Sequence, residues 1–201
     1  MQSIDDKILS RVIKGGKGKI FFSSDFTSFG NNKSILKALE RLTNSGKIIR
    51  IVRGIYCYPK IDKELGLGIL YPSFEEIAKS IAKRDKARIV PTGLYALNKL
   101  GLSTQVPMNI VYLTDGSSRK IPIANGRSIQ FKQTTPKNLA FKNELAMLIT
   151  FALKEITQEK LTKEQLSRIK ELLKNEPREK IQLDIKLMPA WIRRIIMNIY
   201  E

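Results

Sequence analysis

The chain has 201 residues, 42% of them apolar, and its 36 lysines and arginines against 19 aspartates and glutamates give a formal net charge of +17. The apolar content is enough for a packed core and excludes a disordered chain, and the length suits one domain or two small ones. The basic excess indicates an anionic partner, either nucleic acid or a membrane surface. It is most concentrated in residues 1–60, where 12 basic and 4 acidic side chains give +8.

Several classes of protein can be set aside from composition alone. No window approaches the ~18 consecutive apolar residues of a membrane span, and the first residues carry Asp5 and Asp6 with no apolar signal-peptide core. The single cysteine, Cys57, cannot form an intrachain disulfide. The absence of histidine removes the commonest general base and metal ligand. We therefore expect a cytoplasmic protein that is not an enzyme, with no cofactor, no metal and no membrane partner.

Residues 1–60 have the order of elements of a winged helix-turn-helix. A capping box of Ser3 and Asp6 predicts the start of the first helix, and the asparagines and Gly30 before the main helix predict a turn with positive φ. The expected elements are a helix at 3–14, a strand at 19–22, a short helix from 23 or 24 to 29, a turn at 30–32, a helix at 33–44, and strands at 47–52 and 55–58 around Arg53-Gly54.

Residues 61–201 predict a mixed domain with a small β-sheet and a helical C-terminal half. Residues 61–71 read as a linker, and we place the domain boundary there, after residue 60. Asn125-Gly126 between two apolar runs is a strong hairpin signal. The expected elements are helices at 73–83, 92–100, 138–156, 162–174, 179–187 and 190–199, and strands at 87–90, 109–114, 120–124 and 127–133. The fold class is thus α+β, with domains 1–60 and 61–201.

The helix at 33–44 has two unlike faces. Ile35, Leu36, Leu39 and Leu42 recur at helical spacing and are expected to pack inward. The opposite face is basic and polar, as in helices that enter the DNA major groove, and Arg53 at the wing tip suits a phosphate or minor-groove contact. The candidate DNA-binding residues are Asn32, Lys33, Ser34, Lys37, Arg41, Asn44, Lys47, Arg50 and Arg53.

The same segment resembles a known family. The spacing of Phe21 to Gly30, Ile35, Ala38-Leu39, Arg41-Leu42, Gly46, Arg50-Ile51 and Gly54-Ile55-Tyr56 is similar to the N-terminal domain of AbiEi-type antitoxins, and residues 92–102 resemble the helix that follows the linker in that family. The resemblance covers about residues 1–135. It implies an antitoxin of a type IV, abortive-infection toxin–antitoxin system. Such a protein binds repeats in its own promoter, represses its operon and counteracts a nucleotidyltransferase-like toxin.

Three alternatives stay open. The chain can be a plain winged helix transcriptional regulator without a toxin partner, or its winged helix can serve protein contacts only. The third is a Mg²⁺-dependent nuclease, with Asp115 after one strand and Gln130 and Lys132 in a later one. Against the nuclease, Asp115-Gly116 is an ordinary turn pair and glutamine is a poor ligand for a hard cation.

Overall fold

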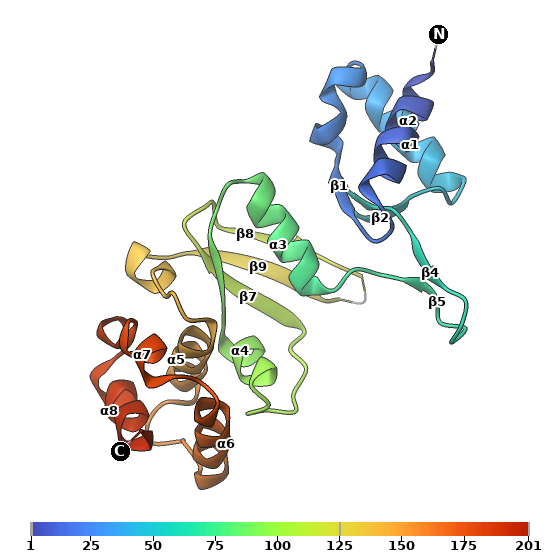
Figure 1. The fold of residues 1–201 in the computed structure, drawn as a ribbon. Helices are drawn as coiled ribbons and strands as arrows, with labels where there is room; N and C mark the ends of the chain where they lie inside the picture. Colours follow the sequence, from blue (N-terminus) through green and yellow to red (C-terminus); the bar gives the residue numbers. More distant parts are fainter. Residues whose placement is uncertain (1, 125, 201) are drawn as a thin grey trace. The chain divides into compact units, whose positions relative to one another are not determined.

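The computed structural model describes residues 2–124 and 126–200 and shows a mixed α and β protein (Figure 1). The chain divides into two compact units, residues 1–80 and 81–201. The predicted α+β class is confirmed. The predicted boundary at residue 60 precedes a β-hairpin that groups with the first unit.

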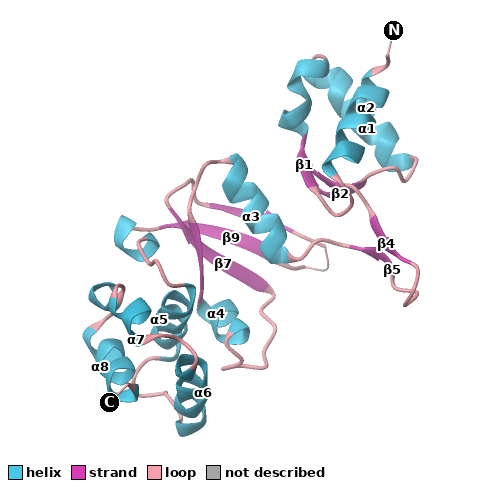
Figure 2. Ribbon diagram, in the orientation of Figure 1, coloured by secondary structure: helices cyan, strands magenta, loops and turns pink. Residues whose placement is uncertain are grey.

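The first unit combines helices with two small sheets, drawn in magenta in Figure 2. The sheet order β1-β3-β2 places the third strand between the first two, and both of its pairings are antiparallel. The elements are α1 (Ile4–Gly15), β1 (Ile20–Phe22), the 3₁₀ helix η1 (Ser23–Phe29), α2 (Asn32–Asn44), β2 (Ile49–Val52), β3 (Ile55–Cys57), β4 (Lys60–Asp62), β5 (Gly68–Leu70) and most of α3 (Phe74–Arg84).

The core of this unit comes from one stripe of each helix. α1 begins at the predicted capping box, since the Ser3 hydroxyl accepts the Asp6 N–H and the Asp6 carboxylate accepts the Ser3 N–H. Ile8 and Val12 of α1 are buried one turn apart. They pack in one cluster with Phe21, Phe26, Ile35, Ala38, Leu39, Leu42, Ile48 and Tyr56.

Three local predictions for this unit were wrong. Gly30 has φ of 166° and Asn31 has φ of −71°, so the turn is extended rather than left-handed; Asn31 instead caps α2, which begins at Asn32 and not at Lys33. Leu36, expected in the core, is 43% exposed. The linker at 61–71 contains the antiparallel pair β4 and β5, in which Ile61 faces Ile69.

The second unit is a four-stranded sheet followed by a helical half. The sheet order is β6-β7-β9-β8, with β7 and β9 parallel and the other two pairings antiparallel. The elements are β6 (Ile89–Thr92), α4 (Gly93–Lys99), β7 (Asn109–Thr114), β8 (Arg119–Pro122), β9 (Ser128–Gln133), the 3₁₀ helix η2 (Pro136–Leu139), α5 (Glu144–Ile156), α6 (Lys163–Lys174), α7 (Arg178–Gln182), the 3₁₀ helix η3 (Ile185–Leu187) and α8 (Ala190–Ile199).

Helix α5 is the centre of this unit. It is apolar on nearly all sides, and α4, α6, α7 and α8 contribute buried side chains to the same cluster. The hairpin of β8 and β9 was predicted and is present, although Asn125 of its turn lies outside the described residues.

Two predicted helices in this unit are each broken into two. The helix at 138–156 is η2 followed by α5, because Asn143 caps α5 and the buried Asp184 carboxylate accepts the backbone N–H groups of Lys142 and Asn143. The helix at 179–187 is α7 followed by η3. Asp184 lies between α7 and η3, at the break in the second predicted helix, and its carboxylate accepts the N–H groups at the break in the first.

Candidate nucleic-acid interface

The N-terminal end of α2 is fixed by a polar cap. The Asn31 side-chain oxygen accepts the Ser34 N–H at 2.8 Å and the Ser34 hydroxyl at 2.9 Å. An asparagine in this position satisfies an N–H group that the helix itself cannot pair. Ser34, a predicted DNA contact, therefore uses its hydroxyl hydrogen within the cap.

The buried residues of α2 define which side chains point away from the core. Ile35, Ala38, Leu39 and Leu42 are buried. The centre of the opposite face is a row at i, i+4, i+7 and i+11, and all four of its members are exposed. That row is Lys33, Lys37, Glu40 and Asn44. Three of them were predicted site residues, and the two lysines occupy the N-terminal half of the helix.

A groove of about 500 Å³ runs between α2 and the β2–β3 turn. Arg50 and Arg53 bring positive charge to its strand side, and Leu36 provides an apolar patch on the helix side. Its lining residues are Ser23, Asn32, Leu36, Glu40, Thr43, Asn44, Arg50, Arg53, Gly54 and Tyr56. The groove thus joins four predicted site residues, Asn32, Asn44, Arg50 and Arg53, in one concave surface.

The turn at the edge of this groove requires glycine. Gly54 has φ of 79°, a conformation that side chains with a Cβ rarely adopt. Its carbonyl oxygen accepts the Ser23 N–H at 3.1 Å, which ties the turn to the start of η1. Arg53, directly before it, is exposed. The turn therefore holds an arginine at a fixed position beside the helix.

Tyr56 was not among the predicted site residues. It lies opposite Arg50 in the register of β2 and β3 and lines the groove, although only 5% of it is exposed. Burial raises the pKa of its hydroxyl; Arg50 opposes this shift and Glu40 adds to it. Side chains that are directly opposite each other in an antiparallel pair lie on the same face of the sheet. The register that pairs Tyr56 with Arg50 therefore places both side chains on one face, and this pairing is the sequence signal that could have identified Tyr56.

Arg41 is held by a partner in another helix. Its Nε and Nη2 donate to the two carboxylate oxygens of Asp5 in α1, at 2.9 and 2.6 Å. The hydrogen bonds from Arg41 are the main reason that the pKa of Asp5 is lowered. The same two N–H groups would be needed for a bidentate contact with the O6 and N7 atoms of a guanine. Arg41 thus lies at the α1 side of the outward face, engaged within the protein.

Lys47 lies apart from the groove. It lines a different hollow of the first unit, together with residues of α1 and of the β4–β5 hairpin. Of the nine predicted site residues, four line the groove: Asn32, Asn44, Arg50 and Arg53. Lys33 and Lys37 are exposed on the outward row of α2, which adjoins the groove through Glu40 and Asn44. Ser34, Arg41 and Lys47 belong neither to that row nor to the groove.

The residues of the nuclease alternative lie directly after β7 and within β9. Asp115 accepts the Arg88 N–H at 2.7 Å and Nε at 2.8 Å, one on each carboxylate oxygen, and hydrogen bonding from Arg88 lowers the pKa of Asp115. Gln130 and Lys132 pair with Val111 and Leu113 within the sheet. Within residues 2–124 and 126–200, no group of three or more acidic or cysteine side chains is arranged to hold a metal ion.

Within the described part of the chain, no helix is long and apolar enough to cross a membrane.

Comparisons with known proteins give the fold and the family. No curated protein matches the sequence. The crystal structure of the RV2827C protein from Mycobacterium tuberculosis is similar in fold, with a TM-score of 0.51 and 15% identity over 96% of this chain and 80% of that one. A family model described as a family of unknown function (DUF6088) matches residues 7–181, and the chain belongs to that family.

Proposed function

We propose that the first unit is a winged helix-turn-helix that binds double-stranded DNA in a sequence-specific way. The order α1, β1, η1, α2, β2, β3 and the sheet order β1-β3-β2 support this proposal, because they match the helix–strand–helix–helix–strand–strand arrangement of that module. In such modules the last helix enters the major groove with its N-terminal residues nearest the bases. Here that helix is α2, and the β2–β3 turn is the wing.

The observation that carries the proposal is the joint position of the cations. Lys33 and Lys37 lie on the outward face of α2, and Arg50 and Arg53 line the groove beside it. We assign Lys33 and Lys37 to base edges or nearby phosphates, and the two arginines to phosphates along the flanking backbone. Asn32 and Asn44 supply side-chain amides at the two ends of α2. Glu40 is the one acid in residues 33–61 and can accept from a cytosine amino group.

We further propose, on the resemblance to AbiEi-type antitoxins, that the DNA is the chain's own promoter and that the protein represses its operon. On the same basis the whole chain counteracts a nucleotidyltransferase-like toxin. A plain transcriptional regulator without a toxin is the second candidate. A reading frame for a nucleotidyltransferase next to the gene, whose toxicity on expression is relieved by this protein, would separate the two.

The DNA-binding part is tested by fluorescence anisotropy with the chain's own upstream DNA and a scrambled duplex of equal length, at two salt concentrations. Specific binders prefer their sites by ~10³-fold or more, and we expect a preference of that order. Equal and steeply salt-dependent affinity for both duplexes would reject a sequence-reading role.

A further inference from the structure

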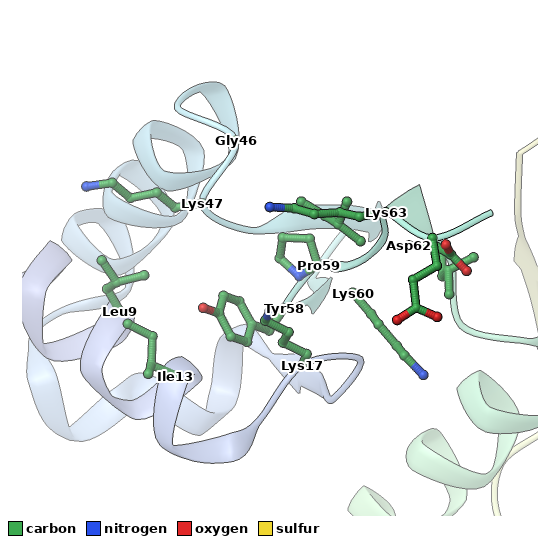
Figure 3. Close-up of a pocket in the computed structure, with 13 residues that line it drawn as sticks. Leu9, Ile13, Lys17, Gly46, Lys47, Tyr58, Pro59, Lys60, Asp62 and Lys63 are labelled. Atoms are coloured by element: carbon green, nitrogen blue, oxygen red, sulfur yellow. The ribbon is translucent and has the colours of Figure 1, made fainter. Parts of the chain in front are cut away.

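A second concave surface of the first unit has a different chemistry. A hollow of about 850 Å³ lies between the end of α1, the turn after α2 and the β4–β5 hairpin (Figure 3). It shares no lining residue with the groove of α2. Its lining residues are Leu9, Ile13, Lys17, Gly46, Lys47, Tyr58, Pro59, Lys60, Ile61, Asp62, Lys63, Glu64 and Leu70.

The floor of the hollow is apolar and open. Leu9 and Ile13 are one turn apart on α1 and face the hollow beside Tyr58 (Figure 3). Ile13 is 52% exposed, and Ile61 on the hairpin is exposed to the same extent. A small anion would gain nothing from these side chains, whereas an apolar side chain entering the hollow would remove them from water.

The rim of the hollow is basic. Four lysines line it, Lys17, Lys47, Lys60 and Lys63, against two acids. One of the acids, Asp62, accepts the Leu65 N–H at 2.8 Å and so closes the hairpin loop. The four lysines and two acids leave a net charge of +2 around an apolar floor.

We propose that this hollow docks an acidic, amphipathic segment of a partner protein, whose apolar side chains cover the floor and whose carboxylates meet the rim lysines. Charge selects this occupant. A second copy of this chain carries +17 and would bring like charge to a basic rim. A nucleic-acid backbone would satisfy the lysines but leave Ile13 and Ile61 in water. The proposal goes beyond DNA binding and does not depend on it, because the α2 groove is a separate surface.

The test begins with a display library of random 16-residue peptides, selected on the full-length protein and then synthesised with a fluorescent label for anisotropy. We expect the selected peptides to carry net negative charge with leucine- or aromatic-rich spacing, and to bind Ile13→Glu and Lys63→Glu at least about tenfold more weakly than the unaltered protein. Val106→Glu and Lys160→Glu are matched controls. They make the same kinds of change, apolar to acidic and basic to acidic, at exposed positions of the second unit, and should change affinity less than about twofold.

Several results would overturn the proposal. These are a library that yields no binder, selected peptides that are basic, or peptides whose affinity is the same for Ile13→Glu as for the unaltered protein. A concentration-dependent dimer that Ile61→Glu abolishes would make a second copy the occupant. A loss of duplex binding in Lys63→Glu without any peptide binding would make the hollow a nucleic-acid surface. Thermal unfolding of each variant checks that the half-exposed Ile13 has been replaced without loss of the fold.

Discussion

Replacing Lys33 and Lys37 together by alanine tests whether the outward face of α2 meets a nucleic-acid backbone. Both side chains are exposed on the row opposite the helix core, so the change should leave the fold intact. Each cation that contacts a phosphate contributes about 0.9 to the slope of log affinity against log salt, so losing two contacts flattens the slope by about 1.8. Over a fourfold rise in salt, from roughly 50 to 200 mM, the double variant should therefore lose about twelvefold less affinity than the unaltered protein.

The assay is anisotropy with the upstream duplex at four or more salt concentrations. Lys47→Ala is the control, because Lys47 is a nearby lysine of the same unit that lies neither on the outward row of α2 nor in the groove beside it. We expect it to change the slope by much less than the roughly 0.9 of a lost phosphate contact. An unchanged slope in the double variant would show that α2 does not face the backbone. A flattening by Lys47→Ala of the same size as that of one α2 lysine would show that the basic surface acts without a defined orientation.

Four further predictions concern Arg41, Asp184 and Cys57. Because the Arg41 guanidinium is bound by Asp5, Arg41→Ala should keep the preference for upstream over scrambled DNA. If the variant loses that preference, Arg41 must leave Asp5 and contact a base. Because the pKa of Asp5 is lowered in the folded protein, its pairing with Arg41 stabilises the fold above the unfolded pKa of about 3.9, and this stabilisation is lost as the pH falls through the folded pKa. Arg41→Ala should therefore melt at a lower temperature than the unaltered protein at pH 7, and at the same temperature once the pH is below the folded pKa of Asp5. Asp184→Ala should lower the free energy of unfolding by about 3 kcal/mol in urea titrations, since it removes the carboxylate that accepts two part-buried N–H groups. A change under 1 kcal/mol, roughly that of one ordinary hydrogen bond, would contradict this. Burial raises the pKa of the Cys57 thiol to about 11, so iodoacetamide at pH 8 should modify it only after denaturation, and rapid labelling of the folded protein would refute its burial.

Helical periodicity and capping residues predicted the helices whose ends and buried faces are determined by neighbouring residues in the sequence. The capping box of Ser3 and Asp6 placed the start of α1, and the hydrophobic spacing within α2 placed its core face except for Leu36. The break before α5 has a distant cause, because the acceptor for the Lys142 and Asn143 N–H groups is Asp184, 42 and 41 residues along the chain. No window of 11–18 residues contains both partners of such a contact.

The candidate site shows the same division. Lys33 and Lys37 were predicted from the outward face of one helix, and the structure keeps them exposed there. Arg41 has an equally basic and equally periodic position, but Asp5 lies 36 residues earlier and engages it. Lys47 adjoins the predicted wing in sequence, yet the chain turns after α2 and places it in the other hollow. Charge and spacing therefore predicted an exposed row of cations on α2, while long-range contacts decide which neighbouring cations share that surface.

The two concave surfaces of the first unit are separate in lining but not in electrostatics. Lys47 lies at the rim of the hollow, and Arg50 at the groove follows three residues later. Three residues of chain separate their Cα atoms by at most about 11 Å, which is comparable to the Debye length of about 10 Å at 0.1 M salt. An acidic segment in the hollow would reduce the positive potential that attracts DNA, and linkage requires that DNA weaken the segment's binding by the same factor. We expect that factor to shrink as salt rises, which anisotropy with DNA and peptide together would measure. A coupling that did not depend on salt would instead require a change in the position of α2, because the groove and the hollow share no residue.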